Sequence, residues 1–174
     1  RPAVNEWNPY RKRIATSSEV QVWMQRYSGF ALVCGPISKN LELLDFDDAD
    51  TCMSFLDAAE RLGLGEIVER IRAGYAELTP SGGAHFPYFC DAVSGNTVLA
   101  KRPLNDPTRP NQKTEAIIET RGDGGYFVAA PSNGKVHENG GAWELLSGGV
   151  DTIATITSDE RKQLHDLART FDQM

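Results

Sequence analysis

The sequence has few cysteines, and none of them is spaced for a metal-binding or disulfide framework. Cys34, Cys52 and Cys90 are widely separated, and no CxxC pair occurs. A zinc site is therefore not expected, and a reduced intracellular setting is favoured. The chain also lacks an apolar run near the roughly 20 residues of a membrane span and lacks a signal-peptide pattern, so no membrane association is expected.

Positive charge is in the minority, with 18 lysine and arginine residues against 24 aspartate and glutamate residues and a net charge of −6. This balance disfavours nucleic-acid binding through overall electrostatics, because affinity for phosphate normally depends on lysine and arginine. Local basic clusters would have to supply that affinity, and they occur at residues 11–13, 101–102 and 109–113.

The length and composition predict one globular domain. The 174 residues are 40% hydrophobic, and the apolar residues are spread along the chain. We therefore expect a single domain over residues 1–174. The chain begins with arginine rather than methionine, which suggests a fragment of a longer protein.

Hydrophobic periodicity and turn residues predict alternating helices and strands, and hence an α/β (α+β) fold. Thr16 and Glu19 have the spacing of a capping box, as do Thr157 and Glu160, so a helix is expected after each pair. The predicted elements are helices at about 17–27, 49–62, 66–76 and from 158 onward, and strands near 30–34, 41–46, 86–90, 116–120, 126–130 and 143–146. The first two strands are expected to form a hairpin, and residues 101–113 a loop.

Two aspartates one residue apart, Asp45 and Asp47, end the apolar run that begins at Leu41. Alternate side chains of a strand share a face, so the two carboxylates point the same way, about 6–7 Å apart at Cα. Such a pair can share divalent cations. The adjacent Asp48 is instead expected to cap the following helix.

A third acid lies in the segment 117–132. Glu119 and Arg121 share a face if this segment is extended, whereas Asp123 falls in a glycine turn. Glu115 and Asp123 remain the alternatives to Glu119.

A glycine-rich turn precedes the strand near residues 86–90. The glycines of Ser81-Gly82-Gly83 allow backbone N–H groups to approach phosphate oxygens closely, and His85 could donate a hydrogen bond to the same group. Arg121 is suited to pairing with phosphate.

This ordered set of motifs resembles the archaeo-eukaryotic primase superfamily, in particular the bifunctional DNA primase/polymerases of phages, prophages and plasmids. The resemblance covers most of the chain and is carried by Asp-Phe-Asp at 45–47, Thr-Pro-Ser-Gly-Gly-Ala-His at 79–85 and Arg-Gly-Asp-Gly-Gly-Tyr at 121–126. It implies an RRM-like, mostly antiparallel sheet with the acids and the histidine on its open face. Flanking helices would cover the other face, and an N-terminal α/β unit would lie beside the sheet.

The resemblance also implies roles for particular residues. Asp45, Asp47 and Glu119 would hold two Mg²⁺ or Mn²⁺ ions, and His85 would act beside them in catalysis. Such ions activate the primer 3′-hydroxyl and neutralise charge on the departing pyrophosphate. The residues expected to bind the nucleotide are Ser81, Gly82, Gly83, His85, Arg121, Lys101, Ser132, Asn133 and His137.

The sequence thus predicts a template-directed DNA primase and polymerase core that transfers nucleotides from a dNTP or NTP to a primer 3′-hydroxyl. Single-stranded or primed DNA, a helicase domain in a longer chain, a mobile element and the cytoplasm of a bacterial host are the expected context. Two alternatives are a non-catalytic module that binds single-stranded nucleic acid and a two-metal nuclease. The nuclease would have no need for a triphosphate cradle at residues 81–85.

Overall fold

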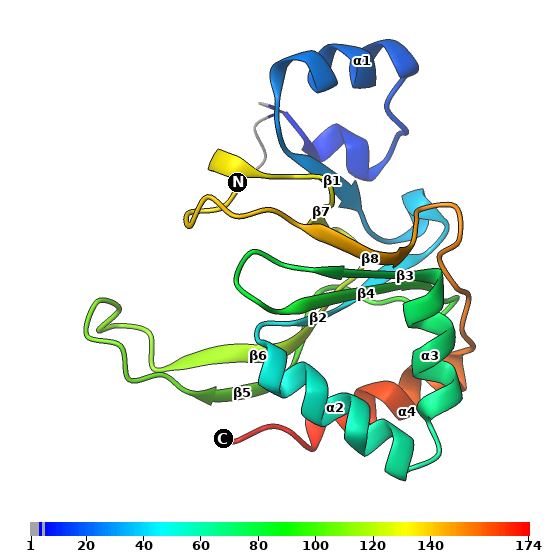
Figure 1. Ribbon diagram of the computed structural model, residues 1–174. Helices are drawn as coiled ribbons and strands as arrows, with labels where there is room; N and C mark the ends of the chain where they lie inside the picture. Colours follow the sequence, from blue (N-terminus) through cyan, green and yellow to red (C-terminus); the bar gives the residue numbers. More distant parts are fainter. Residues whose placement is uncertain (1–3, 5) are drawn as a thin grey trace.

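The computed structural model describes residue 4 and residues 6–174 (Figure 1). Within this part of the chain, one antiparallel sheet has the strand order β5-β6-β2-β4-β3-β8, and β1 pairs antiparallel with β7 in a second sheet. The strands are β1 Phe30–Val33, β2 Leu41–Phe46, β3 Tyr75–Leu78, β4 Ala84–Phe89, β5 Thr97–Pro103, β6 Thr114–Arg121, β7 Tyr126–Ala129 and β8 Glu144–Gly148. The helices are α1 Ser17–Arg26, α2 Ala49–Arg61, α3 Gly65–Gly74 and α4 Ser158–Arg169, with 3-10 turns η1 Asn8–Arg11, η2 Pro36–Ser38 and η3 Gly134–Val136.

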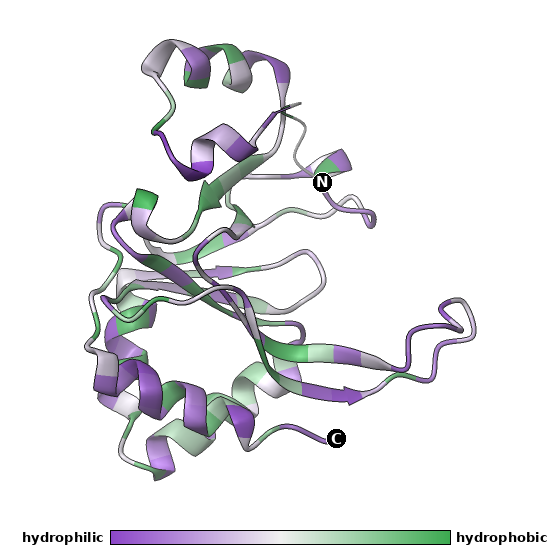
Figure 2. Ribbon diagram, turned by 180° about the vertical axis from the view of Figure 1, so that it is seen from behind, coloured by the Kyte–Doolittle hydropathy of each residue, from purple (hydrophilic) through white to green (hydrophobic). Residues whose placement is uncertain are grey.

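Helices α2, α3 and α4 lie along one face of the main sheet (Figure 1). Leu44 and Phe46 of β2 pack on this side with Phe55 of α2 and Leu164 of α4 in the larger hydrophobic core. The expected mixed α/β fold is therefore confirmed. Apolar residues concentrate in the central strands, whereas the arm that continues β5 and β6 ends in polar residues (Figure 2).

The second sheet packs on the opposite face of β2. Leu41 and Leu43 form a smaller core there with Phe127 and Ala129 of β7. Asp45 is the next β2 residue on the same face, since side chains alternate along a strand. Asp45 therefore lies at the point along β2 where the apolar contact with the second sheet ends.

The structure confirms both predicted capping boxes. Thr16 accepts a hydrogen bond from the Glu19 backbone at the start of α1, and Thr157 does the same for Glu160 at the start of α4. Within the described residues, no helix is long and apolar enough to cross a membrane.

The predicted hairpin between residues 30–34 and 41–46 is wrong. Strand β1 pairs with β7, and β2 lies between β4 and β6. The turn between them contains a 3-10 helix followed by Lys39 and Asn40 in the left-handed region, with φ of 57° and 60°. This turn carries the chain from one sheet to the other.

Two other predicted boundaries are also corrected. The helix expected at 66–76 ends at Gly74, and Tyr75–Leu78 form β3. A Cβ at Gly74 would lie 2.6 Å from the Thr152 carbonyl oxygen, so the chain passes too close to a neighbouring loop for a larger residue. The loop expected at 101–113 begins later, because β5 extends to Pro103 through its pairing with β6.

Candidate active site

A row of ionisable residues crosses the central strands of the main sheet, on the face opposite the helices. Asp45 on β2 pairs directly with Glu119 on β6 and with His85 on β4, and His85 pairs with Glu77 on β3. Directly paired residues present their side chains on the same face of a sheet. The order across four strands is therefore Glu119, Asp45, His85 and Glu77.

The buried His85 ring connects the carboxylates on either side of it. Its Nε2 lies 3.4 Å from Asp45 Oδ1, and its Nδ1 lies 2.6 Å from Glu77 Oε1. Burial alone would lower the pKa of His85, but the bonds to Asp45 and Glu77 outweigh this effect and raise the pKa to about 9. At neutral pH the ring is a buried cation between two carboxylates.

Negative charge accumulates at the end of β2. Although Asp47 is exposed, partial desolvation by neighbouring groups, and then the charges on Asp45 and Glu115, raise its pKa. Burial also raises the pKa of Glu119 against the opposing effect of Arg121, and Asp45 adds to the rise. Carboxylates in this situation favour a nearby cation, and their hard oxygen atoms suit Mg²⁺ or Mn²⁺.

The third expected ligand, Glu119, is engaged by a neighbour on its own strand. Arg121 Nη2 donates a hydrogen bond to Glu119 Oε1. Over residue 4 and residues 6–174, no three His, Cys, Asp or Glu side chains are already grouped for metal coordination. Asp45 and Asp47 thus present oxygen donors at the cavity, whereas Glu119 would have to turn away from Arg121 to join them.

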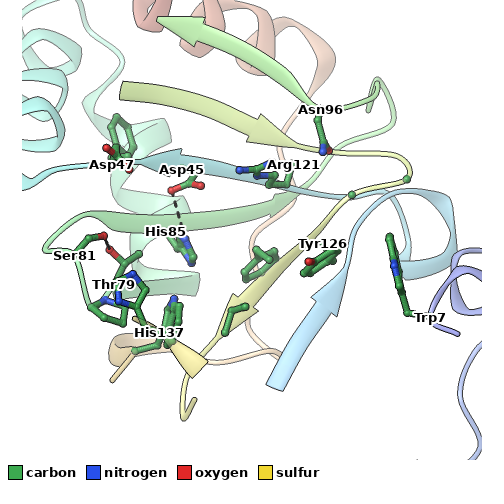
Figure 3. Close-up of a pocket in the computed structure, with 17 residues that line it drawn as sticks. Trp7, Asp45, Asp47, Thr79, Ser81, His85, Asn96, Arg121, Tyr126 and His137 are labelled. Carbon is green, nitrogen blue, oxygen red and sulfur yellow. Dashed lines mark hydrogen bonds and ion pairs between the residues drawn. The ribbon is translucent and has the colours of Figure 1, made fainter. Parts of the chain in front are cut away.

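A cavity of about 460 Å³ opens over this row. Asp45, His85 and Arg121 line its middle (Figure 3). Thr79, Ser81 and His137 lie at one end, whereas Asn96, Tyr126 and Trp7 lie at the other (Figure 3). One end therefore offers hydroxyl and imidazole groups, and the other offers aromatic rings and an amide.

The glycine-rich turn uses some of its own hydrogen-bonding groups. The N–H groups of Gly82 and Gly83 donate to the carbonyl oxygen and to the hydroxyl of Thr79, at 2.9 and 3.0 Å. Ser81 Oγ lies 3.0 Å from Thr79 Oγ1, and both side chains line the cavity. In this turn the glycine N–H groups are already bonded to Thr79, so the hydroxyl groups that line the cavity are the donors available to a ligand.

The remaining predicted nucleotide-binding residues lie in three different environments. His137 lines the cavity, and its ring contacts the edge of Trp143 with ring centroids 5.7 Å apart. Ser132 is buried, and its hydroxyl bridges the backbone N–H and carbonyl of Phe30 at 2.7 and 3.0 Å. Lys101 and Asn133 are exposed and lie outside the cavity lining.

Asp48 has the role expected of it as a helix cap. Its carboxylate accepts a hydrogen bond from Thr51 N at 2.7 Å at the start of α2, and it also pairs with Arg102 at 2.8 Å. These partners separate it functionally from Asp45 and Asp47.

Sequence motifs assigned no role in this site to Glu77, Thr79, Asn96 or Trp7, although Thr79 belongs to the motif at 79–85. Glu77 and Thr79 lie four and two residues before Ser81 of the glycine-rich turn, so their position was a usable signal. Asn96 Oδ1 accepts a hydrogen bond from Gly122 N at 3.1 Å, and this contact depends on tertiary structure. Trp7 meets Tyr126 edge to face, with ring centroids 5.0 Å apart.

Fold and site together define a sheet-based catalytic domain with a cluster of carboxylates facing a polar cavity. The family model described as "Bifunctional DNA primase/polymerase, N-terminal" matches residues 1–158. The chain belongs to this family, and DNA primase/polymerase activity in general follows from that membership. No curated protein matches the chain in the corresponding comparison.

Proposed function

We propose that this domain transfers nucleotides from a dNTP or NTP to a primer 3′-hydroxyl by two-metal chemistry. Asp45 and Asp47 would hold the divalent ions, and Glu119 would join them after its side chain leaves Arg121. The observation that carries the proposal is the direct pairing of Asp45 with both Glu119 and His85, at the cavity and two residues before Asp47. When bound, the ions would lower the pKa of the 3′-hydroxyl and neutralise charge on the pyrophosphate.

The cationic groups of the cavity have a natural role in holding the triphosphate. His85 is buried, carries its positive charge at neutral pH and faces the cavity beside Asp45. Arg121 becomes free to bind a phosphate oxygen when Glu119 turns away from it, and guanidinium binds phosphate well. The hydroxyl groups of Thr79 and Ser81 add donors at one end of the cavity.

The aromatic end of the cavity suits a nucleobase. Trp7 and Tyr126 provide apolar ring surface, and Asn96 provides an amide close by (Figure 3). Stacking of a base on such rings contributes about 1–3 kcal/mol and is tolerant of sequence. Two expectations stay predictions from the family resemblance: a role in replicating a mobile element, and a helicase domain in a longer chain.

Primer extension tests the metal role of the aspartates. The purified domain would be incubated with a primed template, labelled dNTPs and Mg²⁺ or Mn²⁺, beside Asp45→Asn/Asp47→Asn. These replacements keep side-chain volume and remove the charge that holds the ions. We expect incorporation to fall by at least about three orders of magnitude, the scale at which loss of a principal electrostatic group acts.

Asp50→Asn is the matched control, because Asp50 is an exposed acid in the first turn of α2, three residues after Asp47. It should extend the primer at the wild-type rate. Thermal unfolding with and without dNTP provides an independent measurement, since a bound ligand raises the melting temperature. Full activity of the double variant would refute the metal assignment, and metal-independent binding of single strands without extension would favour a binding module.

A further inference from the structure

Glu77 is a fully buried carboxylate that lies beside the cavity without lining it. It is 0% exposed and sits on β3 directly opposite His85 of β4. Its Oε1 faces His85 Nδ1 at 2.6 Å, while its Oε2 accepts hydrogen bonds from Tyr75 Oη and Ala130 N, both at 2.7 Å. Burying a carboxylate is costly unless several donors satisfy it, so three partners indicate a specific arrangement.

These partners fix the direction of the hydrogen bond between Glu77 and His85. The Ala130 backbone N–H can only donate, so Oε2 must remain an acceptor. The two donors on Oε2 stabilise the carboxylate form, which can only accept, so Oε1 accepts from His85 Nδ1 and that nitrogen carries a proton. The other ring nitrogen, Nε2, is directed to Asp45 and the cavity, and Phe127 contacts the ring edge to face with centroids 5.5 Å apart.

We propose that Glu77 is a positioning residue that keeps Nδ1 of the His85 ring protonated and holds the Nε2 N–H toward the bound substrate. The inference rests on the proposed function for the identity of that substrate, a nucleoside triphosphate. The protonation of Nδ1 and the ring orientation follow from the contacts of Glu77 alone. A similar second partner on a functional histidine typically changes activity about 10- to 100-fold when it is removed.

Glu77→Gln reverses the hydrogen bond without changing the shape of the side chain. The Ala130 N–H still requires an acceptor, so the amide oxygen must take the place of Oε2. The amide NH₂ then faces His85 Nδ1 and donates to it, which excludes a proton on that nitrogen. The replacement therefore converts the ring to its neutral form, with the single proton on Nε2.

Nitrogen-15 NMR of the histidine rings distinguishes these states. The chain has three histidines, so substitution of each one assigns its signals. We expect Nδ1 of His85 to be protonated in the wild type and unprotonated in Glu77→Gln. Tyr75→Phe is the matched control, because it removes a donor from the same carboxylate but leaves the bond to His85. It should retain the protonated Nδ1 of the wild type.

The kinetic readout is kcat/KM for the dNTP in primer extension. We expect a loss of about 10- to 100-fold in Glu77→Gln and a change within about threefold in Tyr75→Phe. A protonated Nδ1 in Glu77→Gln, an unprotonated Nδ1 in the wild type, or unchanged kcat/KM after loss of the Nδ1 proton would each overturn the proposal. If the wild type fails to extend primers, the proposed function fails, while the NMR comparison still decides the role of Glu77. If Glu77→Gln fails to fold, the wild-type spectrum decides it.

Discussion

His85 Nε2 lies 3.4 Å from Asp45 Oδ1, across the directly paired positions of β4 and β2. This relationship places a buried cation next to the first of the expected metal ligands. The pairing also limits how much negative charge the cavity carries before a ligand binds. Asp45 therefore has a partner on the protein side, while Asp47 is exposed at the end of the strand.

The ionisation of His85 predicts how stability depends on pH. Its pKa of about 9 in the folded protein exceeds the value of about 6.5 in an unfolded chain, so protonation favours the folded state. This contribution is complete below about pH 6.5 and is lost as the pH rises through 9. Its loss amounts to about 3 kcal/mol in the free energy of unfolding, measured by urea denaturation at a series of pH values.

His85→Gln should flatten the pH dependence over this window. His137→Gln is the control, because the His137 ring bonds to the neutral amide of Asn139 at 2.8 Å. The difference between the wild-type and His85→Gln curves over this window reports the charge of His85 together with the carboxylates that it stabilises, and His137→Gln shows the effect of losing a histidine elsewhere. Equal slopes in the wild type and in His85→Gln would contradict the assigned charge state.

Gly83 is predicted to be essential because the backbone of the acidic strand end passes against it. A Cβ there would overlap the Phe46 carbonyl oxygen and lie 2.9 Å from the Asp47 carbonyl carbon. Gly83→Ala must push that backbone away, at a cost of about 1–3 kcal/mol in stability. We expect it to abolish most primer extension, because Asp47 moves with the backbone.

Gly82→Ala separates this effect from general strain in the turn. Gly82 has φ of 91° and nothing within 4 Å of an added Cβ, so alanine there costs about 1–2 kcal/mol through backbone conformation alone. Its activity should remain within about threefold of the wild type once the protein is folded. Equal activity losses in the two variants would argue against the contact between Gly83 and the Phe46–Asp47 backbone.

Local signals predicted much of the fold. The capping boxes at Thr16 and Thr157 predicted the starts of α1 and α4, because a cap depends on residues three positions apart. The apolar run ending at Asp45 similarly predicted β2. Each of these features depends on residues that lie close together in the chain, so the sequence alone reveals it.

The features that could not be predicted from the sequence depend on contacts between segments that are far apart in the chain. Strand β1 follows the same apolar pattern as a hairpin strand, yet its partner β7 lies far along the chain. Glu77 belongs to the site only because β3 and β4 pair in a register that places it opposite His85. The ion pair of Arg121 with Glu119 depends on side-chain conformation, which the sequence motif does not specify.

Trp7 is predicted to contribute to nucleotide affinity. It forms the outer part of the aromatic end of the cavity through its edge contact with Tyr126. Trp7→Ala removes about 1–1.5 kcal/mol of stacking, so we expect KM for the dNTP to rise about 5- to 10-fold with little change in kcat. Steady-state primer extension over a range of dNTP concentrations measures both constants.

Trp23→Ala is the matched control for that substitution. Trp23 packs against Tyr10, with ring centroids 4.9 Å apart, and lies outside the cavity lining. It removes an indole ring from the same N-terminal segment, so any shared loss would reflect the folding of that segment. A wild-type KM in Trp7→Ala would contradict the assignment of the aromatic end to the base.

The helix-covered face contains a second buried carboxylate, which predicts a purely structural effect. Glu42 is 0% exposed, pairs with Arg161 of α4 at 2.7 Å and accepts a hydrogen bond from Tyr88 Oη at 2.6 Å. Arg161→Ala leaves this carboxylate without its counter-charge, and we expect a loss of about 3–5 kcal/mol in the free energy of unfolding. Lys162→Ala removes an exposed pair with Asp166 from the same helix and should cost less than about 1 kcal/mol.

Because Glu42 faces away from the cavity, Arg161→Ala should retain its dNTP KM at temperatures where it is folded. A stability loss no larger than that of Lys162→Ala would show that water or another group compensates Glu42.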